Sequence, residues 1–162
     1  MGRVPICTCG RVALWHGVVL SAENSQQLTD WYTFTHIVHG VLFYGALALL
    51  VPRQPFATRL LLALCVEGVW EMIENSPAVI DRYREATISL DYYGDSILNS
   101  VGDIGAMALG FWFAARLPRW ASVACVVVVE LSLAWIIRDN LTLNIVMLLH
   151  PVDAIRRWQL GL

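Results

Sequence analysis

The chain contains no lysine, and all 11 of its basic residues are arginine. Charged residues of either sign make up only 15% of the 162 residues, whereas soluble domains carry about 25%. With a net charge of −2 and no run of basic residues, the protein lacks the electrostatic surface that nucleic-acid binding requires. The sequence also lacks internal repeats, low-complexity segments and a recognisable signal peptide, because no apolar stretch of useful length precedes a cleavage site.

Apolar residues are abundant, at 57% of the chain. This composition excludes a disordered chain and a coiled coil, and it favours a small integral membrane protein. We therefore predict an all-α helical bundle that forms a single membrane domain over residues 1–162. Within it, residues 1–29 form an outward-facing N-terminal segment, residues 30–137 form a core of four transmembrane helices, and residues 138–162 form a re-entrant or interfacial tail.

Four stretches have the length of about 20 mostly apolar residues that a bilayer requires. They are Trp31 to Val51, Phe56 to Asn75, Tyr92 to Ala115 and Trp120 to Ile137. The apolar piece from Leu141 to Leu149 covers only about 14 Å as a helix. We expect it to be re-entrant or interfacial, with an amphipathic tail after it.

Arginine placement predicts the orientation of these helices. The connection between the first two stretches holds Arg53 and Arg59, and the connection between the last two holds Arg116 and Arg119, in both cases without acidic residues. Such connections usually face the cytoplasm. The long loop between the second and third stretches and both termini then face outward.

Polar residues recur inside the apolar stretches at helical spacing, so that each set lies on one helix face. Depth along each helix places all of them in the same outward half of the membrane. Charged groups in a bilayer usually face the bundle interior and mark a site. Nearby glycines, Gly40, Gly68, Gly102 and Gly105, are expected to let the helices approach closely. The polar sets are His36 and His39, then Glu67, Glu71 and Glu74, then Asp95, Asn99 and Asp103, and finally Glu130, which we expect to pair with Arg138 or to complete the network.

Several carboxylates in one low-dielectric pocket cannot all be ionised without compensation. Retained protons, arginine partners or a divalent metal ion would each supply it. Histidine and carboxylate side chains suit zinc, manganese or iron. The candidate ligands are His36, His39, Glu67, Glu71, Glu74, Asp95 and Asp103.

Two of the four cysteines, Cys65 and Cys125, stand in apolar runs and are expected to be small core residues. The spacing of Cys7 and Cys9 allows a soft-metal site, a tight disulfide or two thiols in a surface turn.

Asp95, Asn99 and Gly102 resemble the signature helix of the VanZ-like membrane proteins. In that group a histidine in the first helix and a glutamate late in the second accompany the signature. His36 or His39, and Glu71 or Glu74, hold those places here. The resemblance points to the cell envelope or its lipids.

A closer resemblance rests on six segments: Gly2 to Gly10, Leu14 to Gly17, Glu23 to Gln26, Thr29 to Phe34, Ile80 to Arg84 and Arg138 to Asn144. In these segments the chain is similar to a family of small proteobacterial multi-pass inner-membrane proteins of unknown function. This resemblance implies a location in the bacterial inner membrane and supplies no activity. Members of the family carry a further apolar segment ahead of the Cys-x-Cys stretch, so we expect Met1 to be an internal start or a trimmed end.

Two functions remain open. In the first, the protein is an enzyme acting on an envelope lipid or lipid-linked head group, with His36, His39, Glu71 and Asp95 as catalytic groups. Substrate would be held by Arg82, Arg84 and Asn99. In the second, the protein is a non-catalytic binding or assembly protein, whose polar network binds a lipid, a proton or a cation, or fixes helix pairing. The lipid bilayer is the expected partner in both, and nucleic acid in neither.

Overall fold

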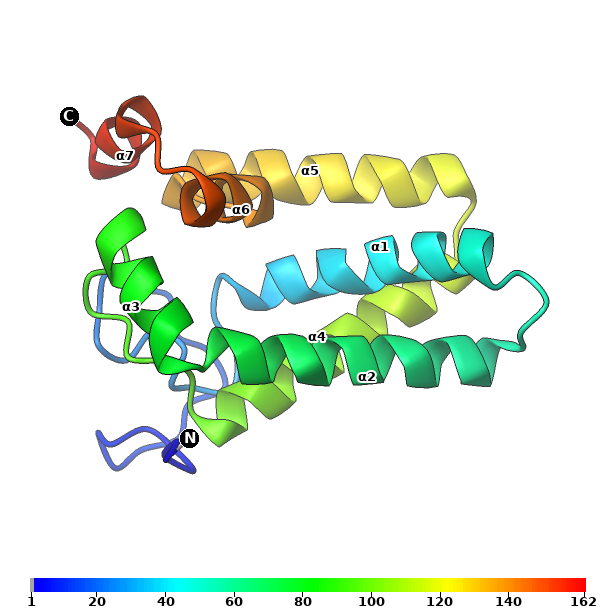
Figure 1. Cartoon of the computed structure of the whole chain (residues 1–162), viewed down its shortest axis with the longest axis horizontal. Coiled ribbons are helices and arrows are strands. Elements are labelled where there is room, and N and C mark those ends of the chain that lie inside the picture. The colour runs from blue at the N-terminus through cyan, green and yellow to red at the C-terminus, as the bar shows by residue number, and fades with distance from the viewer. Residues whose placement is uncertain (1) are drawn as a thin grey trace.

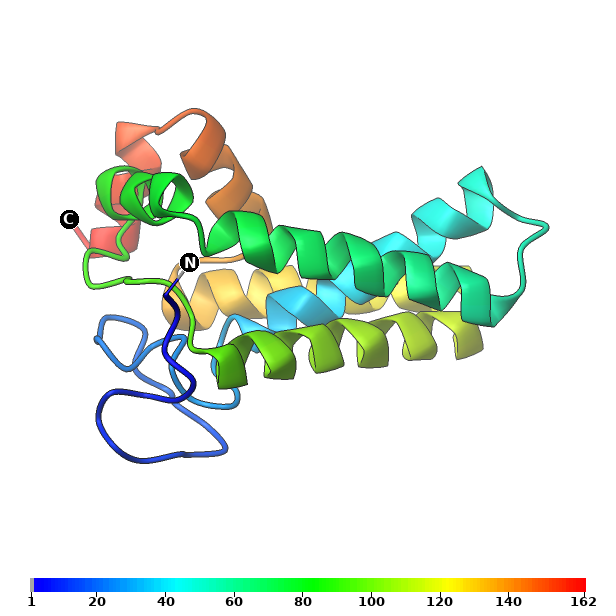
Figure 2. The same ribbon diagram turned by 60° about the horizontal axis from the view of Figure 1, so that its bottom comes forward.

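The computed structural model describes residues 2–162, which form seven helices and no strand. Four long helices lie side by side as a bundle, and three short helices gather with the N-terminal segment at one end of it (Figures 1 and 2). The all-helical prediction is therefore confirmed. The helices are α1 (Thr33–Leu50), α2 (Phe56–Glu74), α3 (Pro77–Ala86), α4 (Ile97–Arg116), α5 (Arg119–Ile137), α6 (Leu141–Leu149) and α7 (Asp153–Leu160).

Each long helix overlaps one of the four predicted stretches, but only α1, α4 and α5 are long and apolar enough to cross a membrane. The prediction of four such helices is corrected to three. Helix α2 falls short because Arg59 and three glutamates interrupt it. The third predicted stretch also begins later than expected, because α4 starts at Ile97, where the Ser96 side chain caps it by accepting from Asn99 N.

Helix α2 has its charged side chains inside and its apolar side chains outside. Its buried face carries Ala63, Glu67 and Glu71. A surface helix of a soluble protein has the reverse pattern. The glutamates of α2 therefore point toward the other helices and not toward the surroundings. The exposed side chains of α2 include Leu61, Leu62, Val66, Val69, Met72 and Ile73.

The closest helix contact in the bundle is the crossing of α1 and α4, where glycines remove the side chains. A Cβ atom added to Gly40 would lie 2.0 Å from the carbonyl oxygen of Met107, and one added to Gly110 would lie 2.1 Å from that of Ile37. The expected role of Gly40 is confirmed. Gly102 instead approaches the backbone of Leu28, in the N-terminal segment.

The expected role of Gly68 and Gly105 is wrong, because a Cβ at either position meets nothing within 4 Å. The prediction that the cysteines of the long helices are small core residues is also wrong. Cys65 and Cys125 are exposed on the outer faces of α2 and α5. An apolar run whose outer face is itself apolar does not distinguish the inward face from the outward one.

The two halves of the bundle differ in chemistry. Away from the short helices, Ala63, Met107 and Phe111 form a fully buried apolar cluster. The ring of Phe111 packs edge-on against Tyr44 at 5.2 Å. The buried histidines and carboxylates lie toward the other end, where α1 and α4 begin and α2 ends. Apolar packing thus fixes the helices, and their polar ends converge.

Two short helices, α6 and α7, occupy the segment for which a re-entrant or interfacial tail is predicted. The sequence predicts that Glu130 pairs with Arg138 or completes the polar network. In the structure Glu130 does not pair with Arg138 but caps the beginning of α6. Its carboxylate accepts from Leu141 N at 3.1 Å and from Thr142 N at 3.0 Å. A carboxylate at a helix N-terminus is favoured by the unsatisfied amides and the helix dipole there. Arg138 donates instead to the carbonyl of Trp158.

Substitution of Gly40 by alanine tests the helix crossing. The added Cβ would meet the Met107 oxygen at 2.0 Å, so we expect Gly40→Ala to lower the free energy of unfolding by about 1–3 kcal/mol. Thermal unfolding of the detergent-solubilised protein measures it. Gly45→Ala on the same helix is the control, because its Cβ meets nothing within 4 Å. Equal behaviour of the two variants would contradict the close crossing.

Candidate functional site: a buried histidine–carboxylate cluster

The N-terminal segment covers the polar end of the bundle and bonds to the start of α4. Ser96 donates from its backbone N to the carbonyl of Ser25 and from its hydroxyl to the carbonyl of Gln26, both at 3.0 Å. Asn99 donates its side-chain amide to the carbonyl of Gln27 at 2.9 Å. These bonds close the end of the bundle with backbone and amide groups.

Both histidines of α1 turn toward a single glutamate of α2. His36 Nδ1 donates to Glu67 Oε1 at 2.6 Å, and His39 Nδ1 lies 3.1 Å from Glu67 Oε2. Glu67 is completely buried and His36 is 6% exposed. The two imidazole rings meet edge-on at 5.0 Å. A buried carboxylate that accepts from two imidazoles fixes the orientation and tautomer of both rings.

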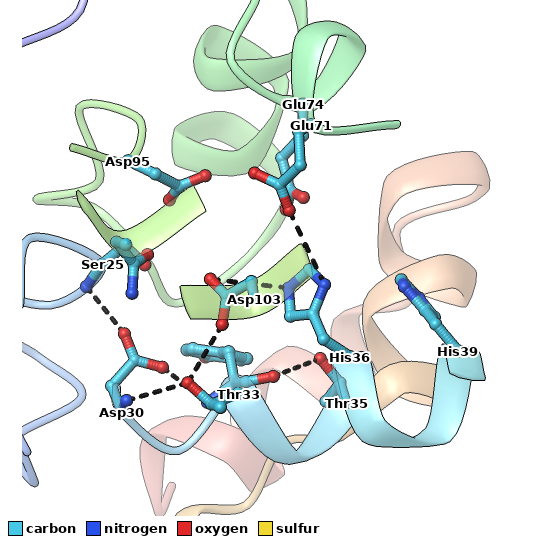
Figure 3. Close-up of polar contacts among 12 residues, drawn as sticks. Ser25, Asp30, Thr33, Thr35, His36, His39, Glu71, Glu74, Asp95 and Asp103 are labelled. Atoms are coloured by element: carbon cyan, nitrogen blue, oxygen red, sulfur yellow. Dashed lines mark hydrogen bonds and ion pairs between the residues drawn. The ribbon is translucent and has the colours of Figure 1, made fainter. Parts of the chain in front are cut away.

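The second nitrogen of His36 faces α4. His36 Nε2 lies 3.9 Å from Asp103 Oδ2, and the hydroxyl of Thr33 donates to Asp103 Oδ1 at 3.0 Å. Figure 3 shows Asp103 between His36 and Thr33. Thr33 in turn accepts from Asp30 N at 3.0 Å. Side chains from α1, α2 and α4 thus converge on one imidazole, as the helical spacing predicted.

Glu71 is the exception in this bonded cluster. It is 5% exposed, and neither carboxylate oxygen has a hydrogen-bond partner among the described residues. Its Oε1 lies 3.7 Å from His36 Nδ1, a nitrogen already bonded to Glu67, and Figure 3 shows it directed at that ring. An unsatisfied buried polar group costs about 1–3 kcal/mol, and more when charged. Glu71 is therefore available to a ligand.

A second group of carboxylates lies beside the first and is held by tyrosines. Tyr92 donates to Asp95 Oδ1 at 3.1 Å, Asn75 donates to Asp95 Oδ2 at 2.7 Å, and Tyr83 donates to Glu74 at 2.9 Å. Burial raises the pKa of Asp95 above its ordinary value, although the Asn75 bond opposes this. Tyr92 itself is buried and lines the cavity.

A cavity of about 50 Å³ joins the two groups. It has room for a few water molecules or an ion, and none of the described residues that line it is an arginine. The lining is rich in carboxylates, hydroxyls, amides and imidazoles. It comprises Asn24, Ser25, Tyr32, Thr35, His36, His39, Trp70, Glu74, Tyr83, Ser89, Tyr92, Asp95, Asp103, Leu141 and Asn144.

Of the seven candidate metal ligands, five lie in two groups whose ligand atoms are within 4.8 Å of one another, namely His36, His39, Glu67, Glu71 and Asp103. The other two, Glu74 and Asp95, line the same cavity. The structure does not bring the three candidate substrate-binding residues to the cavity. Arg82 donates to the carbonyl of Leu148 at 2.9 Å, and Arg84 pairs with Asp81 and lies over the ring of Tyr93. Asn99 is occupied by the N-terminal segment. Both arginines belong to α3, and the residue between them, Tyr83, lines the cavity instead.

Asp139 is a buried polar residue that lies outside the predicted apolar stretches and was not predicted to belong to the site. Its carboxylate accepts from Tyr32 Oη at 2.8 Å, Asn144 Nδ2 at 3.1 Å and Gln159 Nε2 at 3.0 Å. It therefore ties the start of α1 to α6 and α7 at the edge of the cavity. The segment Arg138 to Asn144, which carries part of the family resemblance, could have indicated this centre. It places the carboxylate of Asp139 close in sequence to the side-chain amides of Asn140 and Asn144.

Cys7 and Cys9 form a disulfide, which was one of the three alternatives that the sequence left open. Cys7 is buried. The Sγ atom of Cys9 accepts from Gln27 Nε2 at 3.5 Å, and Gln27 also donates to Glu23 at 3.2 Å. The disulfide therefore belongs to the folded N-terminal segment.

Fold and site together define a helical protein with three helices apolar enough to cross a membrane and a histidine–carboxylate cluster buried at one end of its bundle. The chain belongs to the family described as "Protein of unknown function (DUF2585)", whose model matches residues 1–161. The family occurs in proteobacteria, and its description assigns no activity.

Relatives match the whole length of the chain. A "UPF0314 protein" of Paracoccus denitrificans is 59% identical over 162 residues, which are 100% of this chain and 84% of the relative. A "UPF0314 protein" of Sphingopyxis alaskensis is 53% identical over 161 residues, 99% of this chain and 86% of the relative. No solved structure matches. The wider resemblance to VanZ-like proteins stays a prediction.

The pH dependence of stability tests the environment of Asp139. Burial raises the pKa of Asp139 from 3.8 to about 6, so the folded protein binds this proton more tightly than the unfolded chain. The contribution of Asp139 to stability is therefore full below its ordinary pKa and is lost as the pH rises through about 6. The difference corresponds to about 3 kcal/mol.

We expect Asp139→Asn to flatten the decline in stability between pH 4 and pH 8, measured by thermal unfolding in detergent. Burial also raises the pKa values of Asp30 and Asp95. Both residues are present in the wild type and in the variant, so their contributions cancel when the two pH profiles are compared. Asp153→Asn, at an exposed position, is the control and should leave the slope unchanged. A slope that Asp139→Asn leaves unaltered would contradict the buried, protonatable carboxylate.

Proposed function

We propose that this protein is a multi-pass protein of the bacterial inner membrane that acts on an envelope lipid or lipid-linked head group at the outer face. One observation carries the proposal: two histidines and several carboxylates from α1, α2 and α4 line a single cavity at one end of an outwardly apolar bundle. Polar groups buried at such a cost in a membrane usually mark a functional site.

The distribution of charge supports the orientation. Arg53 lies between α1 and α2, and Arg59 lies in the first turn of α2. Arg116 ends α4 and Arg119 begins α5. Residues 51–66 and 104–129 contain no acidic residue, so this end of the bundle is basic and suits the cytoplasmic face. This orientation requires α2 to cross the membrane together with α1, α4 and α5, although α2 alone falls short of the composition of a spanning helix. Its apolar outer face suits contact with lipid, and its buried Glu67 and Glu71 face the other helices.

The cavity is equipped for proton transfer. Glu67 holds the Nδ1 proton of His36, which leaves Nε2 as the basic nitrogen of that ring. Asp95, whose pKa burial raises, is suited to donate a proton at a higher pH than an ordinary carboxyl group. His36 then serves as the base and Asp95 as the acid. Arg82 and Arg84 have no part in this proposal, since neither lines the cavity.

The alternative function is a non-catalytic one, in which the cluster binds a proton or cation and stabilises an assembly. The size of the cavity favours this alternative, because a volume of about 50 Å³ admits water or an ion. A lipid head group would enter only if the N-terminal segment or α6 moved. A catalytic role therefore requires an opening at this end.

Fusions of alkaline phosphatase test the proposed orientation, since the enzyme is active only outside the cytoplasm. We expect active fusions after Glu85 and after His150, and inactive ones after Arg53 and Arg116. A matched set of fusions to a cytoplasmic reporter should give the opposite pattern. Activity after Arg53 would place the polar cluster on the cytoplasmic side and overturn the proposed site of action.

Lipid analysis of a deletion strain tests the proposed activity. We expect at least one envelope lipid or lipid-linked species to change in abundance in the deletion strain and to be restored by the wild-type gene. His36→Gln and Asp95→Asn should fail to restore it, because they remove the base and the acid. His150→Gln, at an exposed position, is the control. A lipid profile that none of these strains alters would contradict the proposal.

A further inference from the structure

The unpartnered carboxylate of Glu71 indicates a missing ligand. Its two oxygens are buried between α1, α2 and α4 without a hydrogen-bond partner among the described residues. Its nearest charged neighbour is His36, at 3.7 Å, and Glu67 already occupies the nitrogen that faces it. A group that binds both Glu71 and the free part of the His36 ring would satisfy the site.

Charge favours a cation in this position. The carboxylates of Asp30, Glu67, Glu71, Asp95 and Asp103 are all buried. Across residues 2–162, the only ion-pair partners of Glu67, Glu71 and Asp103 are the two histidines. Two imidazoles cannot neutralise this many carboxylates, whereas a divalent cation removes most of the repulsion.

Three of the buried side chains lie close enough together to bind one metal ion. One histidine nitrogen and one carboxylate oxygen each from Glu71 and Asp103 all lie within 4.8 Å of one another. Metal bonds of about 2.1 Å place neighbouring ligands about 3.4 Å apart in a tetrahedral site, so small side-chain rotations are sufficient. Asp103 Oδ2 lies 3.9 Å from His36 Nε2, whereas Glu71 Oε1 lies 3.7 Å from Nδ1. Because Glu67 already holds Nδ1 at 2.6 Å, we assign the ligating atom to Nε2, and Glu71 has to rotate toward that nitrogen to join Asp103.

Other contacts match the outer shell of a metal site. A metal-bound histidine usually donates its other nitrogen to a carboxylate, which fixes the ring and raises its basicity. Glu67 has this relation to His36, and the hydroxyl of Thr33 orients Asp103 at 3.0 Å. His39, also bonded to Glu67, supports the same carboxylate.

We propose that His36, Glu71 and Asp103 bind one divalent transition-metal ion, with a water molecule from the cavity at its fourth position. One nitrogen and two oxygen ligands suit zinc, manganese or iron(II), and an open position is the arrangement of catalytic metal sites. The inference deepens the proposed function and changes one role in it, because an ion on Nε2 takes the lone pair that His36 would use as the base. The ion would lower the pKa of its water molecule, and that water would supply the base in place of His36. Only this chemical role rests on the proposed function, since binding of the ion is independent of any substrate.

Metal analysis of the detergent-purified full chain, with its affinity tag removed, tests the site. The protein is stripped with a chelator and dialysed against zinc or manganese, and bound metal is measured by mass spectrometry. We expect about one ion per chain. Glu71→Gln and Asp103→Asn keep the side-chain shape and should weaken binding at least 10-fold. Glu67→Gln should weaken it by about 10–100-fold, as an outer-shell change.

Glu23→Gln is the matched control, because Glu23 lies outside the proposed site, in a separate group of potential ligands with Cys7 and Cys9. It should bind as the wild type does. Absence of an ion at saturating metal, or equal binding by Glu71→Gln and the wild type, would overturn the metal site. Binding with an unchanged lipid profile would overturn the proposed function alone, and a lipid change without bound metal would overturn the metal site alone.

Discussion

The constraint on which this structure depends is that α2 cannot turn its glutamates outward. The outer face of α2 is apolar and its inner face carries Glu67 and Glu71, so the helix has one orientation in which both faces are satisfied. In that orientation Glu67 meets the two histidines of α1. Burial of the carboxylates therefore determines the rotation of α2 and, with it, the composition of the site.

The glycine crossing of α1 and α4 supplies the second constraint. With Gly40 and Gly110 at the contact, the two backbones approach too closely for any Cβ. The crossing lies within a helical turn or so of His36 and two turns from Asp103, so it holds these two side chains at a fixed spacing. Precision in a polar site requires rigid supports, and here apolar packing elsewhere on the same two helices provides them.

The sequence predicted the site better than it predicted the helices around it. Spacing of i, i+3 and i, i+4 was sufficient to place His36, Glu67, Glu71 and Asp103 on inward faces, because charged groups strongly prefer the interior of such a bundle. No comparable preference locates cysteine, and Cys65 and Cys125 lie outside. The contacts of the N-terminal segment could not be predicted from helical spacing either. Asn99, which shares the helix face of Asp103, bonds to Gln27, which is 72 residues away in the sequence.

The enclosure of the cluster is separate from the packing that fixes the helices. The N-terminal segment bonds to Ser96 and Asn99, while Asp139 ties Tyr32 to α6 and α7. Both closures are built from hydrogen bonds at the end of the bundle, and neither involves the apolar crossing. The apolar half of the bundle therefore fixes the positions of α1 and α4, while hydrogen bonds of the N-terminal segment, α6 and α7 close the polar half, which contains the cluster.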